Sequence, residues 1–225
     1  MRSLPPRGLA TLAVAFLALA SACGGQGAST VITTPSTTTD FTPQTSAPPA
    51  PPSDVTRLVL QVSDLGGGYA RFPTDTHPIS IAQETSNDSA RAAAIEQATY
   101  LGGHQAAFHR PGVAVLLSTA LAYTSASAVH QVDTDPQTIR ITAAELHGRR
   151  LPIPAGAPGL DPLLIQGTTR LNGRRLPADF YVWRRGTFAF AIFMIGRRAD
   201  VRAVVSLARL QDARIRRFAS STGTA

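Results

Sequence analysis

The 225-residue sequence predicts an α+β fold, a mostly antiparallel β-sheet covered by helices. Apolar segments separated by short turns indicate β-hairpins within residues 101–123 and 178–195. Apolar residues at helical spacing over residues 201–218 predict a C-terminal amphipathic helix. Because strands joined by short turns run antiparallel, the sheet is expected to be mostly antiparallel too.

The first 23 residues have the organisation of an export signal. Arg2 and Arg7 give a positive start, and residues 9–20 are a run that is apolar except for Thr11. A helix of that length reaches about 18 Å, well short of the roughly 30 Å bilayer core, so the run predicts a signal sequence and not a membrane span. Three small residues, 20–22, lead into Cys23, which is the only cysteine.

Residues 19–23, Leu-Ala-Ser-Ala-Cys, resemble the lipobox of bacterial lipoproteins, with alanine at the third position before the cysteine where leucine is commoner. The resemblance implies that Cys23 is acylated, for example with palmitate, and becomes the new N-terminus. It also implies a lipid anchor on the extracytoplasmic face of the cell membrane. The alternative is an ordinary secretory signal that is cleaved after a small residue.

The next segment is expected to be a tether. Twenty of the 29 residues from 24 to 52 are Thr, Ser, Pro or Gly, so this stretch has too little apolar surface to order itself and should be disordered. A single domain is expected over residues 53–220, with a frayed tail at 221–225.

Composition restricts the chemistry of that domain. All 21 basic residues are arginine, which excludes lysine-dependent catalysis. Without cysteine, the domain is expected to have no disulfide and no thiolate metal site. The net charge is +7, and residues 148–225 hold 14 arginines against four aspartates, which favours anionic partners.

The first half of the domain is expected to alternate helices with strands. Ser53 can N-cap a helix, and triple glycine can end it. A strand that is apolar on both faces, 113–123, is expected at the centre of the sheet. The expected order is helix 54–64, strand 69–72, polar loop 73–87, helix 88–99, strands 101–109 and 113–123, a helix through 126–132 capped by Ser125, and helix 137–147.

The second half is expected to be two hairpins and a helix. Residues 151–162 contain four prolines and cannot be regular structure. Strand 163–171 leads into Asn172-Gly173, a good two-residue hairpin turn. Strands 178–184 and 187–195 follow, and Asp200 is expected to cap the last helix. The similar patterns of residues 108–129 and 183–205 suggest a pseudo-repeat of hairpin-plus-helix units.

Motifs for catalysis are absent from the sequence. It has no Gly-x-Ser-x-Gly, Ser-x-x-Lys, His-Glu-x-x-His or phosphate-loop pattern, so no catalytic residue, no metal ligand and no cofactor is predicted. The histidines lack convergent partners at metal-ligand spacing. They are His77, His104, His109, His130 and His147.

Arginine pairs near turns are the candidate anion-binding residues, because a guanidinium group suits phosphate or carboxylate. The six candidates are Arg174, Arg175, Arg184, Arg185, Arg197 and Arg198. An anionic lipid or a wall polymer would fit them, and the alternative is a solvated basic surface. Nucleic acid is not expected as a partner of an exported protein. The aromatic residues of 180–193 are expected to form core, with an acyl-chain cavity as the alternative.

Residues 62–69, 184–188 and 207–215 together resemble small exported lipoproteins of high-GC, actinobacteria-like bacteria. That resemblance brings no catalytic residues with it. The favoured function is a non-catalytic binding, sensing or envelope-assembly role at the membrane, with another envelope protein as a further candidate partner. The alternatives are an envelope lipid or glycolipid carrier, which needs a long apolar cavity, and a hydrolase, which needs Asp, His and Ser in one cleft.

Overall fold

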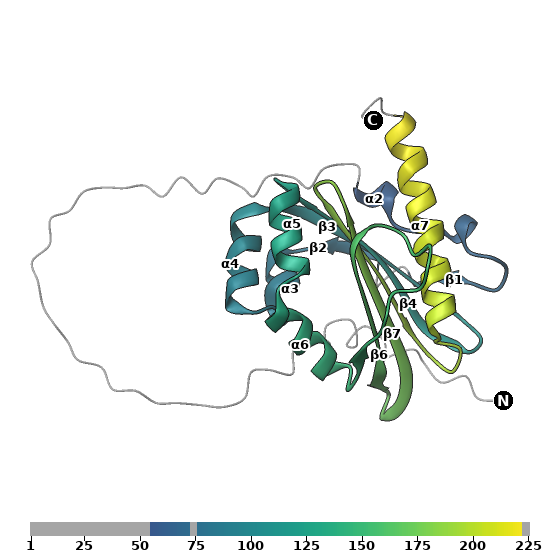
Figure 1. Ribbon diagram of the computed structural model, residues 1–225. Helices are drawn as coiled ribbons and strands as arrows, with labels where there is room; N and C mark the ends of the chain where they lie inside the picture. Colours follow the sequence, from purple (N-terminus) through teal and green to yellow (C-terminus); the bar gives the residue numbers. More distant parts are fainter. Residues whose placement is uncertain (1–54, 73–75, 222–225) are drawn as a thin grey trace, which may run out of the picture.

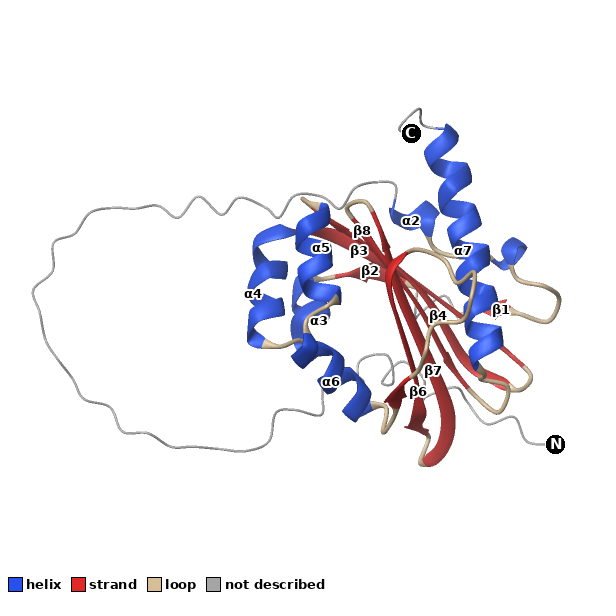
Figure 2. Ribbon diagram, viewed as in Figure 1, coloured by secondary structure: helices blue, strands red, loops and turns tan. Residues whose placement is uncertain are grey.

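The protein folds as an antiparallel β-sheet with helices on both faces, as the computed structural model shows for residues 55–72 and 76–221 (Figures 1 and 2). This confirms the predicted α+β class. The leader, Cys23, the tether and the tail beyond Ser221 lie outside the described residues, so those predictions stay predictions.

The strands are β1 (Ala70–Arg71), β2 (His77–Ile79), β3 (Tyr100–Arg110), β4 (Val113–Tyr123), β5 (Arg149–Arg150), β6 (Leu160–Leu171), β7 (Arg174–Arg185) and β8 (Phe188–Ile195). The α-helices are α2 (Val55–Leu58), α3 (Ile81–Glu84), α4 (Ala90–Thr99), α5 (Ala126–Asp133), α6 (Pro136–Glu145) and α7 (Val201–Ser221). Short 3-10 helices are η1 (Val62–Asp64) and η3 (Thr85–Asn87).

The sheet is built from long hairpins in the order β1-β3-β4-β8-β7-β6-β5, with β2 also paired to β3. Asn172 and Gly173 have φ angles of 51° and 74°, which confirms the predicted two-residue turn between β6 and β7. Strand β4 has neighbours on both sides and joins the two halves of the sheet through β8, which confirms its central place.

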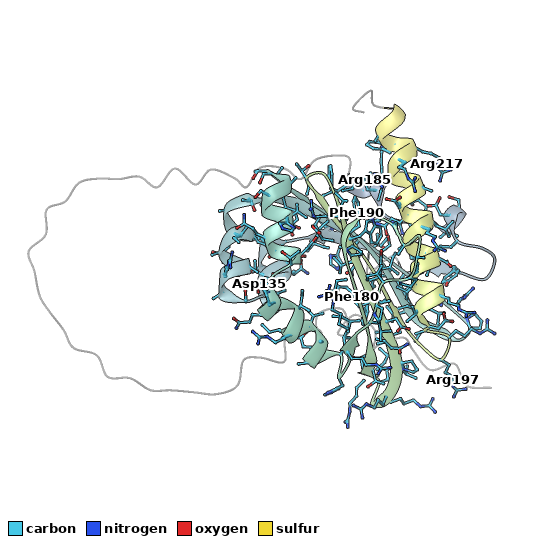
Figure 3. The ribbon with its side chains drawn as sticks, in the orientation of Figure 1. Asp135, Phe180, Arg185, Phe190, Arg197 and Arg217 are labelled. Carbon is cyan, nitrogen blue, oxygen red and sulfur yellow. The ribbon has the colours of Figure 1, made fainter. Side chains whose placement is uncertain are left out.

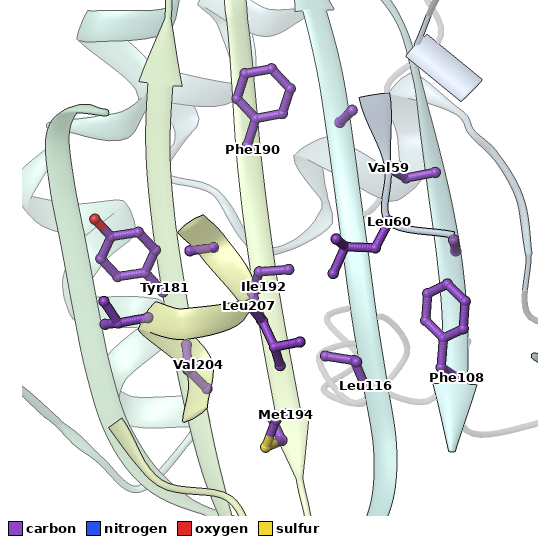
Figure 4. Close-up of a cluster of buried hydrophobic side chains, with 14 of the residues drawn as sticks. Val59, Leu60, Phe108, Leu116, Tyr181, Phe190, Ile192, Met194, Val204 and Leu207 are labelled. Carbon is purple, nitrogen blue, oxygen red and sulfur yellow. The ribbon is translucent and has the colours of Figure 1, made fainter. Parts of the chain in front are cut away.

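One face of the sheet is covered by α7 and by the first described segment (Figure 4). Val204, Val205 and Ala208 on α7 are buried against β7 and β8. The Asp200 carboxylate accepts a hydrogen bond of 2.8 Å from the amide of Ala203, so the predicted N-cap is confirmed. The helix continues to Ser221, three residues beyond its expected end at Phe218.

The prediction of one helix over residues 54–64 is wrong, because α2 ends at Leu58. Val59 and Leu60 continue in non-helical backbone and are completely buried between α7 and the sheet. The Leu60 amide donates to the hydroxyl of Ser118 on β4, at 2.9 Å, and not to a helical carbonyl. Burial of two large apolar side chains outweighs the weak helix preference of this segment.

The polar loop expected over residues 73–87 is also wrong, because β2, α3 and η3 lie within it. Ser80 N-caps α3 by accepting from the amide of Gln83, and the Gln83 side chain accepts from the Ser80 amide in return. This reciprocal pair is a capping box, whose signal Ser-x-x-Gln was present in the sequence. Residues 73–75 lie outside the described residues.

Helices α3 to α6 cover the opposite face of the sheet from α7 (Figure 1). The predicted N-cap Ser125 is confirmed. Ser89 caps α4 and Asp135 caps α6, two caps that were not predicted from the sequence. The two expected hairpin-plus-helix units are present as β3-β4-α5 and β7-β8-α7. Their helices, α5 and α7, pack on opposite faces of the sheet. Among the described residues, no helix is both long and apolar enough to cross a membrane.

Candidate ligand-binding site

A cavity of about 330 Å³ separates the sheet from helices α3 to α6. Its floor is apolar because alternate residues of β4, β7 and β8 point to this face of the sheet. The central floor residues are Val115, Leu117, Phe180, Val182, Ala191 and Phe193. Space of this size with an apolar lining is typical of sites for small organic ligands.

The aromatic residues of 180–193 are divided between the core and the cavity, because successive residues of a strand point to opposite faces of the sheet. Trp183 stacks on Phe190 with ring centroids 5.5 Å apart, and Tyr181 lies beside Trp183, all on the α7 face. Phe180 and Phe193 lie on the cavity face, edge to face at 6.0 Å. The expectation of a packed core is therefore right for the first three rings, whereas the last two line the cavity.

Carboxyl groups gather at the helical wall of the cavity. Glu84 ends α3, Asp88 precedes α4, Glu96 lies on α4 and Asp133 ends α5. Glu96 is completely buried, and its Oε1 accepts a hydrogen bond of 2.9 Å from the hydroxyl of Tyr123. Within the described residues, Oε2 of Glu96 and Oδ2 of Asp133 are buried and accept no hydrogen bond.

These acids hold their protons more tightly than free carboxyl groups do. Burial, together with the neighbouring acids, raises the pKa of Glu84 to about 8 and that of Glu96 to about 10. Burial likewise raises the pKa of Asp133 to about 7, although the Arg184 charge opposes that rise. Burial raises the pKa of Asp88 too, although the interaction with the neighbouring Glu96 opposes that rise. The wall is thus partly protonated at neutral pH.

The arginine nearest this wall is already paired. Nε of Arg184 donates to Oδ2 of Asp161 at 2.6 Å, and His130 Nδ1 lies 2.7 Å from the same oxygen. The hydrogen bond from Arg184 lowers the pKa of Asp161. Arg170 also lines the cavity, on β6 next to the β6–β7 turn, and Glu145 of α6 lines it as well. The described lining therefore combines an apolar floor with several acids and one arginine.

The six candidate anion-binding arginines do not share one groove. Arg174 and Arg175 start β7, and Arg197 and Arg198 follow β8 at the same end of the sheet, where the Gly196 amide donates to the Pro177 carbonyl. Arg184 and Arg185 lie at the other end, as the labels of Arg185 and Arg197 in Figure 3 show. Arg185 is paired with Asp212 at 2.8 Å. Anion binding by any of these six arginines stays a prediction.

The histidines are dispersed. His77 lines the cavity and His130 pairs with Asp161, whereas His109 stacks on the ring of Phe72. In the described part of the chain, no three His, Cys, Asp or Glu side chains are grouped as metal ligands would be.

Sequence reasoning missed the acidic wall. One signal was available: Ala92 and Glu96 are four residues apart on α4 and share its buried face. A carboxyl group on the buried face of an alanine-rich helix is unusual unless it has a partner or a function. The remaining acids come from segments whose tertiary positions the sequence did not reveal.

Comparisons with known proteins show a likeness of fold. No protein-family model and no curated protein sequence matches the chain significantly. Among solved structures, the extracellular domain of PknH from Mycobacterium tuberculosis has a similar fold, with a TM-score of 0.50 and 8% sequence identity. The match covers 75% of this chain and 98% of the PknH domain. At that identity the likeness concerns the fold alone.

Proposed function

We propose that this protein is a membrane-anchored, extracytoplasmic binding protein that holds an apolar or amphipathic small molecule in the cavity between the sheet and helices α3 to α6. The observation that carries the proposal is the 330 Å³ cavity with its apolar floor and acidic wall. A well-packed domain leaves few voids larger than a water molecule, so a cavity of this size suits a role in binding.

The location rests on two independent supports. The leader resembles a lipoprotein signal that ends at Cys23, and acylation there would hold the domain at the outer face of the membrane. The PknH domain of similar fold is itself extracellular. Both agree with a role outside the cytoplasm.

Binding is favoured over hydrolysis by the composition of the lining. A hydrolase of the expected type needs Asp, His and Ser in one cleft. In the described part of the chain the cavity is lined by several acids and by His77, but by no serine. The apolar floor instead supports a ligand with an apolar part, such as the acyl chain of a lipid.

Native mass spectrometry tests the proposal. The full chain would be exported in a high-GC bacterial host, purified in a mild detergent and compared in its native and denatured masses. We expect a non-covalent small molecule on the wild-type protein. Ala191→Trp should exclude it, because Ala191 lies in the cavity floor and the indole fills the space.

The matched control is Ala213→Trp, which adds the same side chain at an exposed position of α7. This variant should retain the adduct. Absence of any adduct from the wild-type protein, or the same adduct on both variants, would contradict the proposed function.

A further inference from the structure

Within the described residues, none of the ion pairs joins an arginine to an acid of the cavity wall. Glu84, Asp88, Glu96 and Asp133 reach it from α3, α4 and α5, in a protein whose net charge is +7. Arg184 acts on Asp133, but its guanidinium group is already bonded to Asp161. Burying several acids together is costly unless they are protonated or meet a cation.

The arrangement does not suit a metal ion. Metal sites bring three or more ligand groups around one point, and no such grouping occurs in the described part of the chain. The acids instead border a space large enough for an organic group. Two of their oxygens, Oε2 of Glu96 and Oδ2 of Asp133, are buried and accept no hydrogen bond within the described residues.

We propose that the cavity takes an amphipathic organic amine, whose ammonium group lies among Glu84, Glu96 and Asp133. The apolar body lies along the floor formed by Phe180 and Phe193. An ammonium group offers N–H donors only, which is what a wall of carboxyl oxygens requires. This inference rests on the proposed function, since it needs the cavity to be a binding site.

The release of protons by the cavity acids on binding distinguishes an amine from a neutral ligand. Burial and mutual repulsion keep protons on these acids at neutral pH. An incoming cation favours their ionised forms and lowers their pKa values. Binding of an amine therefore releases protons to the buffer, whereas binding of a neutral molecule with the same tail does not.

The test uses three probes that share an eight-carbon tail: octylamine, octanol and octanoate. The full chain in nanodiscs of zwitterionic lipid would be titrated with each by calorimetry at pH 7, with Ala191→Trp measuring the background from the bilayer. We expect octylamine to bind at least about tenfold more tightly than octanol, as charge-assisted hydrogen bonds allow, and octanoate not to exceed the background. The octylamine enthalpy should depend on the ionisation enthalpy of the buffer.

The variants Glu84→Gln and Asp133→Asn remove one charge each and keep the side-chain shape, so both should fold. Each should reduce the preference for octylamine over octanol to within about threefold. The control Asp200→Asn removes the same charge at the start of α7, on the other face of the sheet, and Asn also caps helices well. It should leave the preference unchanged.

Two results overturn the amine proposal. In one, octanol binds above the background as tightly as octylamine, which would indicate a neutral head group and leave the proposed function intact. In the other, no probe exceeds the Ala191→Trp background. That result contradicts the proposed function as well, so the two failures are distinguishable.

Discussion

Ser118 joins three distant parts of the chain through one hydroxyl group. It accepts a hydrogen bond from the Leu60 amide and donates one of 2.9 Å to Oε1 of Gln211 on α7. Nε2 of Gln211 in turn donates to the Thr119 carbonyl at 3.0 Å. Ser118 and Gln211 are completely buried, so each of these groups depends on the others for its hydrogen bonds.

Ser118→Ala should therefore lower the free energy of unfolding by about 2 kcal/mol, because it leaves a buried amide and a buried amide oxygen without partners. Urea denaturation of the full chain measures the change. Ser127→Ala is the control, since Ser127 is exposed and bonds only to Gln131, and it should stay within about 0.5 kcal/mol of the wild type. Equal effects of the two substitutions would contradict the bridging role.

The proline-rich residues 151–159 are irregular, as predicted, and they are held firmly. The prediction is wrong for residues 160–162, because β6 begins at Leu160 and its register shift between Leu160 and Leu163 accommodates Pro162. Tyr181 donates its hydroxyl proton to the Pro158 carbonyl at 2.7 Å, and Arg209 of α7 donates to the Gly156 carbonyl at 3.1 Å. Gly159 lies against Trp183 with a φ angle of +84°. The segment therefore closes the end of the core next to the buried indole.

Gly159→Ala should lower the free energy of unfolding by about 3 kcal/mol or more, since the new Cβ would approach Trp183 Cδ1 to 2.2 Å at an unfavourable φ. The control Gly173→Ala has a similar φ of +74° with nothing within 4 Å, and about 1 kcal/mol is expected from backbone strain alone. Thermal and urea unfolding give both values. A loss at Gly159 no larger than at Gly173 would show that the contact with Trp183 tolerates a methyl group.

Elements with strong local signals were predictable from the sequence. The hairpin turn at Asn172-Gly173, the caps at Ser125 and Asp200 and the apolar strand β4 have causes that act within a few residues. The prediction of helix at Val59 and Leu60 was wrong because the conformation there is set by burial under α7, which lies far away in the sequence. The acidic wall was not predicted for the same reason, since α3, α4 and α5 meet only in the folded protein.

At the scale of the whole molecule, the cavity acids should set the pH dependence of stability. Glu84 has a folded pKa of about 8 against an ordinary value of 4.5, and the folded pKa of Glu96 is about 10. Between about pH 5 and pH 8 the folded protein therefore holds protons that the unfolded chain releases, so stability falls as pH rises. Asp161 has a lowered pKa, and its contribution is lost only in more acidic solution.

The melting temperature of the full chain should accordingly be higher at pH 5.5 than at pH 8. Glu84→Gln should flatten this dependence and raise the melting temperature at pH 8, because it removes a charge that the fold disfavours. Asp200→Asn is the control and should keep the wild-type slope. A melting temperature that rises steadily from pH 5.5 to pH 8 would rule out the raised carboxyl pKa values.

The hydrogen bonds that connect Leu60 through Ser118 to Gln211 also have a consequence for biosynthesis. The first and last segments of the domain share one core, with β4 between them. A growing chain reaches residue 211 only after every strand of the sheet, so Val59 and Leu60 must wait for α7 before their burial is complete. Nascent chains that stop before Val201 would leave this face of the sheet uncovered, and an apolar surface of that kind attracts chaperones or aggregates. This core can therefore be completed only after α7 has been synthesised.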